Sequence, residues 1–174
     1  MALTRPQPTG IERFFDKDEI IVSKTDLTGK ITYANRVFVR VSGYTEAELL
    51  GAPHSILRHP DMPRCVFKLL WDTIQSGREI FAYVVNLSKN GDHYWVHAHV
   101  TPSFDGAGKI VGYHSNRRVP DRAKVDKIAG IYQALLTEEG KYSDKIVAMN
   151  AGTALLTSVL AGQEIDYEEF VWSL

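Results

Sequence analysis

The sequence predicts an α+β fold: a five-stranded antiparallel sheet with helices on one face, followed by a C-terminal helical tail. Two short strand-like segments precede a stretch of helical fragments, three longer strand-like segments follow it, and helical periodicity begins at residue 121. Short turns between consecutive strands favour antiparallel pairing, and the helical crossover can cover one face. The chain therefore divides into an N-terminal cap segment (1–19), a central domain (20–120) and the tail (121–174).

The first two strands are predicted to form a hairpin. They are Glu19–Lys24 and Lys30–Ala34, joined by a turn at Asp26–Gly29. The residues that follow, as far as Leu57, contain helical fragments separated by turns. Among them, Thr45 and Glu48 have the spacing of a capping box, which predicts the start of a short helix.

An amphipathic helix is predicted between Pro63 and Gly77. Apolar side chains recur along it at spacings of three and four residues: Val66, Phe67, Leu70, Trp71 and Ile74. Three long strands are then predicted to form a meander: Glu79–Ser88, His93–Ser103 and Lys109–Arg118. Because the helix joins two groups of strands in one sheet, we expect its apolar face to enclose a ligand-sized space against the sheet.

The tail is predicted to be a helical hairpin that breaks at Gly140. Its first helix carries a near-heptad apolar stripe: Val125, Ile128, Tyr132 and Leu135. A second amphipathic run covers Ser143–Leu160, and the aromatic C-terminus is expected to dock on another surface. Two interpretations of the stripe stay open: it packs on a second subunit, or it covers the sheet of its own chain.

Composition excludes several classes of protein. Twenty Lys and Arg residues against 21 Asp and Glu give a net charge of −1, so no basic field favours nucleic acid or anionic lipid. Residues 121–174 hold 5 basic and 9 acidic side chains, against 15 and 12 in residues 1–120, which marks the tail as a separate piece. One cysteine, Cys65, excludes a disulfide framework. Without a signal peptide or an apolar run of about 18 residues, we expect a cytoplasmic protein with no membrane insertion.

Catalytic and metal-binding patterns are weak. No GxSxG, HExxH or Walker loop is present, and the glycines at 106, 108 and 112 fall in a hairpin between strands. His93, His97 and His99 share one strand face, where an HxH pair could bind zinc or iron if a third ligand lay nearby. An ordinary half-exposed strand is the favoured interpretation.

The densest polar cluster is the segment RHPDMP, residues 58–63, immediately before the amphipathic helix. One interpretation is structural, with Asp61 as the N-cap and Pro63 in the first helical turn. The other places Arg58 and His59 at the mouth of a pocket, where they bind a phosphate-bearing ligand, since Arg grips phosphate oxygens in bidentate fashion.

The stretch GYTEAELLGAPHSILRHPDMPRCVFKLLWDTIQSG, followed by KNGDHYWVHAHVTP, strongly resembles the PAS domains of the Aer family of aerotaxis transducers. The resemblance covers about residues 20–120, and RHPDMP and KNGDHYW are its specific signatures. It implies a PAS fold and a non-covalently bound FAD that serves as a redox reporter. Carried over by position, the FAD-retention residues and further pocket candidates are Arg58, His59, Asp61, Asn35, Phe67, Trp71, Asn86 and His54.

Each assignment has a physical rationale. Arg58 and His59 can meet the pyrophosphate, and Trp71 offers an aromatic face to a fused ring. The amide of Asn86 or Asn35 has both a donor and an acceptor, which matches the pyrimidine edge of an isoalloxazine.

The chain departs from the family pattern at several positions. Where members usually carry Trp and Gly after the helix and a basic pair before KNG, this chain has Ile80, Ala82, Leu87 and Ser88. We therefore expect altered flavin surroundings. His54 stands where light-oxygen-voltage photoreceptors carry their adduct-forming cysteine, which argues against that photochemistry. The chain stops before a membrane anchor, so the expectation is a free-standing PAS protein similar to the PAS partners of bipartite energy-taxis receptors.

The resulting hypothesis is a cytoplasmic redox or energy-taxis sensor, not an enzyme, that binds FAD and signals to a chemoreceptor-type partner, as a homodimer. Flavin reduction would convert a ring acceptor into a donor, and a facing amide would reorient; the last strands would pass this change to the tail. Three alternatives remain: a haem-binding PAS oxygen sensor with His59 or His114 as axial ligand, a ligand-free PAS dimerisation adaptor, and a small metalloenzyme using His97 and His99.

Overall fold

The computed structural model describes residues 5–174, so the first four residues of the predicted cap segment lie outside the described residues. The strands are β1 (Ile21–Thr25), β2 (Ile31–Ala34), β3 (Ile80–Leu87), β4 (His93–Phe104) and β5 (Ile110–Arg118). The helices are α1 (Arg36–Ser42), α2 (Glu46–Leu49), the 3₁₀ turn η1 (His54–Leu57), α3 (Arg64–Gln75), α4 (Arg122–Glu139), α5 (Lys145–Gly162) and α6 (Tyr167–Ser173). The predicted order of elements is confirmed.

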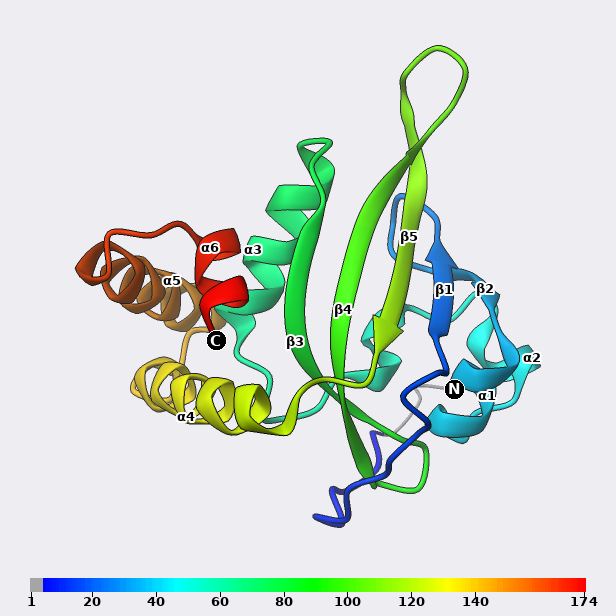
Figure 1. Ribbon diagram of the computed structural model, residues 1–174, viewed down its shortest axis with the longest axis horizontal. Coiled ribbons are helices and arrows are strands. Elements are labelled where there is room, and N and C mark those ends of the chain that lie inside the picture. Colours follow the sequence, from blue (N-terminus) through cyan, green and yellow to red (C-terminus); the bar gives the residue numbers. More distant parts are fainter. Residues whose placement is uncertain (1–4) are drawn as a thin grey trace.

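The five strands form one antiparallel sheet in the order β2-β1-β5-β4-β3, and the β4–β5 hairpin projects beyond its neighbours (Figure 1). Ser23 of β1 pairs with Ala34 of β2, which confirms the first hairpin. The capping box predicted from Thr45 and Glu48 is present at the start of α2. Because strands 2 and 3 lie at opposite edges of the sheet, the chain between them must cross one face, and this crossover contains α1, α2, η1 and α3.

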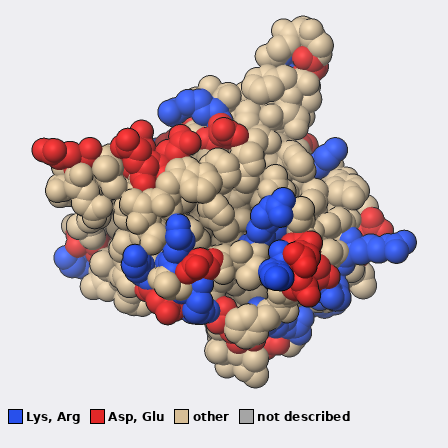
Figure 2. Space-filling model, in the orientation of Figure 1, with Lys and Arg blue, Asp and Glu red and all other residues tan. Residues whose placement is uncertain are grey.

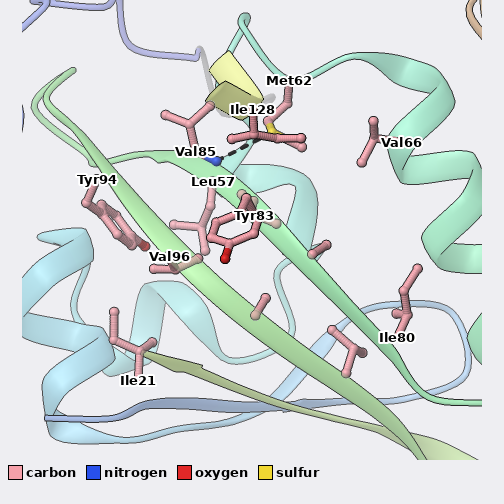
Figure 3. Close-up of a cluster of buried hydrophobic side chains, with 14 of the residues drawn as sticks. Ile21, Leu57, Met62, Val66, Ile80, Tyr83, Val85, Tyr94, Val96 and Ile128 are labelled. Atoms are coloured by element: carbon pink, nitrogen blue, oxygen red, sulfur yellow. Dashed lines mark hydrogen bonds between the residues drawn. The ribbon is translucent and has the colours of Figure 1, made fainter. Parts of the chain in front are cut away.

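Helix α3 begins directly after Pro63, as predicted, but its cap differs from the structural interpretation of the turn. Its N-cap is Pro63, which has no side-chain acceptor, so the interpretation of Asp61 as the cap is wrong. The RHPDMP turn instead covers the edge of β3: Arg58 forms an antiparallel bridge with Asn86, and the Val85 amide donates to Met62 Sδ (3.4 Å; Figure 3). The turn thereby satisfies backbone groups that an edge strand would otherwise expose.

The tail helices gather on one side of the molecule, beside β3 and α3 (Figure 1). The near-heptad stripe predicted on α4 is buried within the same chain: Val125, Ile128, Tyr132 and Leu135. Tyr132 donates its hydroxyl to the Tyr83 carbonyl at 2.6 Å, and Phe170 and Val171 of α6 are buried as well. Of the two interpretations of the stripe, the structure therefore shows the intramolecular one.

The second tail helix, α5, differs from the amphipathic run that we expected, because apolar residues surround most of its circumference. By length and composition it meets the minimum for a membrane-spanning helix, with 18 residues of mean hydropathy 1.3, although helices of soluble proteins meet the same criterion. The expectation of no membrane insertion therefore stays a prediction. Figure 2 shows acidic side chains gathered over the C-terminal helices, where Glu164, Asp166, Glu168 and Glu169 are exposed.

Candidate functional site

A cavity of about 650 Å³ lies between the sheet and the segment from η1 to α3. Alternation along the strands points Val84, Ala98 and Val100 toward it, and α3 supplies the opposite wall. The α3 residues that line it are Phe67, Leu70, Trp71 and Ile74. Small-molecule sites of this volume are typically apolar with a few placed polar groups, which is the pattern seen here.

Two buried side chains that line this cavity carry polar groups with no hydrogen-bond partner among residues 5–174. Asn86, on β3, has an Nδ2 group that no acceptor among residues 5–174 satisfies. Arg117, on β5, is 2% exposed; its Nε and Nη1 groups lack acceptors, while Nη2 donates to Ser23 Oγ at 2.6 Å. Leaving buried donors unpaired costs about 1–3 kcal/mol each, so their presence points to a ligand that supplies acceptors.

Arg117, Ser23 and His54 form a short polar chain along the wall. Burial lowers the pKa of Arg117 to about 10, which still leaves it a cation at neutral pH. Burial, followed by the charge of Arg117, lowers the pKa of His54 to about 3, so its ring is neutral. Because Ser23 Oγ accepts from Arg117, its proton is available to His54 Nε2 at 3.2 Å. The Ser23 hydroxyl can donate to Nε2 when the ring proton is on Nδ1, and can accept from Nε2–H in the other tautomer.

Trp71 closes the end of the cavity beside the β1–β2 turn. Its ring meets the ring of Tyr113 edge-on, with centroids 5.5 Å apart. Its Cη2 atom lies against Gly29, where a Cβ would sit 2.9 Å away and the backbone has a φ of +81°. Only glycine fits both the turn and the indole, so this turn fixes Trp71 as an aromatic wall.

Cationic side chains line the cavity where it meets solvent. The guanidinium of Arg58 lies 4.6 Å from the centre of the Phe67 ring, and burial, then the charge of Arg64, lowers its pKa. Arg64 and Lys68 of α3 and Lys145 of α5 are further lining residues. Lys68 pairs with Asp72, whereas the other three cations form no ion pair among residues 5–174. This end of the cavity therefore favours an anionic group.

Five of the eight predicted site residues line the cavity: His54, Arg58, Phe67, Trp71 and Asn86. Asn35 lies elsewhere, because its amide caps α1 through Phe38 N (3.0 Å) and ties it to β1 through the Ile20 carbonyl (2.8 Å). His59 is buried in the RHPDMP turn, where Nδ1 accepts from the Asp61 amide at 3.1 Å. The carboxylate of Asp61 is exposed. His59 and Asp61 order the turn that presents Arg58 and do not touch the cavity.

Sequence reasoning missed Arg117, Ser23 and the tail residues of the wall. The predicted meander contained a signal for Arg117, since pairing β4 with β5 sets it opposite Ala98, on the cavity face. Nothing in the sequence of α5 indicated that Lys145, Ile146 and Met149 line the same space.

The histidines of β4 lie on the opposite face of the sheet. His97 packs against Tyr83 (4.8 Å between ring centroids) and Trp172 (5.8 Å), and His99 contacts Glu79 at 2.7 Å. Within residues 5–174, no three His, Cys, Asp or Glu side chains come close enough to bind one metal ion. The HxH pair thus lacks the third ligand that the metal hypothesis required.

Comparisons with known proteins agree with this architecture. The profile of the PAS fold family matches residues 31–117. The chain is 43% identical to the aerotaxis receptor of Escherichia coli K12 over 129 residues (74% of this chain, 25% of the receptor). It is 28% identical to the nitrogen fixation regulatory protein of Klebsiella pneumoniae over 117 residues (67% and 24%).

A solved light-oxygen-voltage domain, described with a flavin analogue, superposes with a TM-score of 0.59 at 18% identity, covering 67% of this chain and 88% of that one. This likeness concerns the fold alone. The chain spans about a quarter of the length of the two curated relatives. The chain belongs to the PAS family, and its domain is of the type found in the aerotaxis receptor.

Proposed function

We propose that the cavity binds FAD non-covalently and that the protein is a cytoplasmic redox sensor rather than an enzyme. The observation that carries the proposal is a set of buried, unpartnered donors on the wall of an apolar cavity: Asn86 Nδ2 and the Nε and Nη1 groups of Arg117. A flat ring with acceptors along one edge satisfies such donors and fills the apolar slot between Trp71 and the sheet. The cations at the opening suit phosphate groups.

Three residues of the cavity are proposed to bind different parts of the ligand. Arg58 binds phosphate oxygens, Trp71 stacks beside the ring system, and Asn86 donates to its polar edge. A bound flavin would supply a redox centre whose reduction adds a proton to a ring nitrogen. Asn86 is an amide, so rotating its side chain exchanges donor for acceptor, which keeps a hydrogen bond in either redox state.

The position of Asn86 on β3 links the cavity to the tail. Three residues earlier on the same strand, the Tyr83 carbonyl accepts from Tyr132 of α4 at 2.6 Å. A movement of β3 therefore reaches α4 directly. The partner is proposed to be a chemoreceptor-type signalling protein, with a homodimer as the acting form; the support is the match to an aerotaxis receptor.

The test is to purify the chain, record its absorption spectrum and identify the pigment released on denaturation. FAD is the expected pigment, and Arg58→Ala should lose it while Arg36→Ala, an exposed control on α1, keeps it. Wild-type retention by Arg58→Ala would contradict the site assignment.

The same spectrum separates the rival functions. A Soret band would favour the haem alternative, for which His114, a cavity-lining residue, is the better placed axial ligand. A colourless protein that takes up no added FAD would leave the dimerisation adaptor.

A further inference from the structure

The C-terminal tail supplies part of the cavity wall. Lys145, Ile146 and Met149, from the first turns of α5, line the same space as Arg58 and Trp71. Lys145 is exposed and Ile146 is 65% exposed, so these residues lie where the cavity opens to solvent. They fall outside residues 31–117, the segment matched by the PAS family profile, so this part of the wall lies beyond the matched domain.

The tail is also fastened to α3 by an unusual cap. Glu139, the last residue of α4, is 7% exposed, and its carboxylate accepts from the backbone amides of Arg64 (3.0 Å) and Cys65 (2.9 Å). Pro63 has no side-chain group to cap α3, so Glu139, 75 positions after Arg64, does so. A carboxylate at a helix N-terminus satisfies free amides and matches the helix dipole.

Helix α5 packs directly against this cap at Gly152. A Cβ at Gly152 would lie 2.7 Å from Glu139 Oε1 and 3.1 Å from Cys65 Sγ. Helices α3, α4 and α5 therefore meet at one point, and the absence of a side chain at Gly152 permits it. A rigid connection at this point fixes where the first turn of α5 sits relative to α3.

The wall between α3 and α5 is positively charged on both sides. Arg64 comes from α3 and Lys145 from α5, and neither forms an ion pair among residues 5–174. Arg58 lies on the same cavity, and the charge of Arg64 contributes to the lowering of its pKa. The buried carboxylate of Glu139 already holds the start of α3 beside α5. An anion in the cavity would add a second link between the two helices if it bound Arg64 and Lys145 together.

We propose that Lys145, with Arg64, binds the diphosphate of the flavin, so that ligand binding fastens the tail to α3 and ligand loss loosens it. The inference rests on the proposed function and adds to it a binding residue outside the shared domain. Cofactor binding would then change how firmly the exposed start of α5 is held against α3. By thermodynamic linkage, the free energy by which the docked tail strengthens FAD binding equals the free energy by which bound FAD stabilises the docked tail.

The first test compares ligands that differ in their phosphates. The apo form of the full chain is titrated with FAD, FMN and riboflavin, following the quenching of flavin fluorescence. Lys145→Ala should weaken FAD binding about 10-fold and riboflavin binding less than 2-fold, because riboflavin has no phosphate. Lys141→Ala is the matched control: this lysine lies in the α4–α5 connection, pairs with Glu138 and does not line the cavity.

Each outcome is decisive. If wild type binds FAD and Lys145→Ala binds it equally well, or loses FAD and riboflavin to the same degree, the inference is wrong while the proposed function stands. If wild type binds none of the three flavins, the proposed function fails and takes the inference with it.

The second test measures hydrogen–deuterium exchange in α5. Saturating FAD should slow exchange at residues 145–152 in wild type and in Lys141→Ala, and saturating riboflavin should slow it less. In Lys145→Ala held at FAD saturation, the protection should shrink to that given by riboflavin. Equal protection of α5 by FAD and riboflavin in wild type would overturn the coupling.

Discussion

The two faces of the central sheet are built for different tasks. On one face, Ala98 and Val100 border an open cavity, and Asn86 and Arg117 carry polar groups with no protein partner. On the other face, the tail fills the space with aromatic contacts: the Trp95 ring stacks on Tyr132 with centroids 6.2 Å apart. On the hollow face, unfilled space and unpaired donors lower the stability of the ligand-free fold. On the filled face, side-chain packing stabilises it. Mutations on the two faces should therefore separate binding from folding.

The largest expected effect lies on the filled face. Ile128, on α4, is 1% exposed, and Ile128→Ala should lower the free energy of unfolding by about 2–4 kcal/mol, because it removes buried methyl groups and leaves a cavity. Urea titration of the apo protein measures it. The exposed control, Ile146→Ala, should change it by less than about 0.5 kcal/mol. A loss below 1 kcal/mol for Ile128→Ala would show that the tail does not contribute packing to the fold.

The opposite response is expected on the hollow face. Arg117→Met replaces a buried cation with a side chain of similar length, so the apo protein should gain about 1–2 kcal/mol of stability, while FAD affinity falls at least 10-fold. Urea titration and FAD titration of the same preparation give both numbers. Lower stability together with unchanged FAD affinity would mean that Arg117 is a structural residue, and the contrast between the faces would disappear.

The neutral histidine of the cavity makes the hollow face sensitive to acid. The pKa of His54 is about 3 in the folded protein and near 6.5 when unfolded, so the unfolded state binds the extra proton between these values. The stability of the apo protein should therefore fall as pH drops below 6.5, with His54 contributing at most about 1.4 kcal/mol per pH unit.

Replacing His54 with Asn should reduce this slope between pH 6.5 and 5. The control, His99→Asn, removes a histidine that lies on the filled face and contacts Glu79. This variant leaves the cavity intact and shows how much of any change comes from losing a histidine elsewhere. Equal slopes for wild type and His54→Asn would show that His54 is not held neutral.

The smallest effect concerns the point where the tail meets α3. Cys65 is 1% exposed, and burial together with the neighbouring Glu139 raises the pKa of its thiol to about 12. A thiol reagent at pH 8 should leave native Cys65 unmodified over an hour and react fully in urea. Rapid reaction in the native protein would show that the tail opens readily even under stabilising conditions.

Local patterns predicted most of the fold. The two strands of the first hairpin, the capping box at Thr45 and the three-and-four spacing in α3 all depend on neighbours within a few residues, and all are confirmed. Asp61 was wrongly considered as the cap of α3 because the actual cap, Glu139, comes from a distant part of the chain. No local signal records such a contact.

In the candidate site, too, residues on segments with local motifs were predicted, and residues placed by long-range packing were not. Arg58 and Trp71 lie on segments with strong motifs, and they line the cavity as predicted from the family resemblance. Asn35 was chosen for an amide that the fold uses to cap α1 and to donate to the Ile20 carbonyl. Lys145 was missed because only the packing of α5 on α3 brings it to the cavity.

The most direct test of the account observes the amide of Asn86, whose Nδ2 group is buried without a partner. In a ¹H–¹⁵N spectrum of the labelled full chain, the side-chain signals of this residue can be assigned by their loss in Asn86→Leu. Adding oxidised FAD should shift them strongly as the amide gains an acceptor, and reducing the flavin in the same sample should shift them again. Unchanged signals at saturating FAD would contradict the claim that this amide forms a hydrogen bond to the ligand.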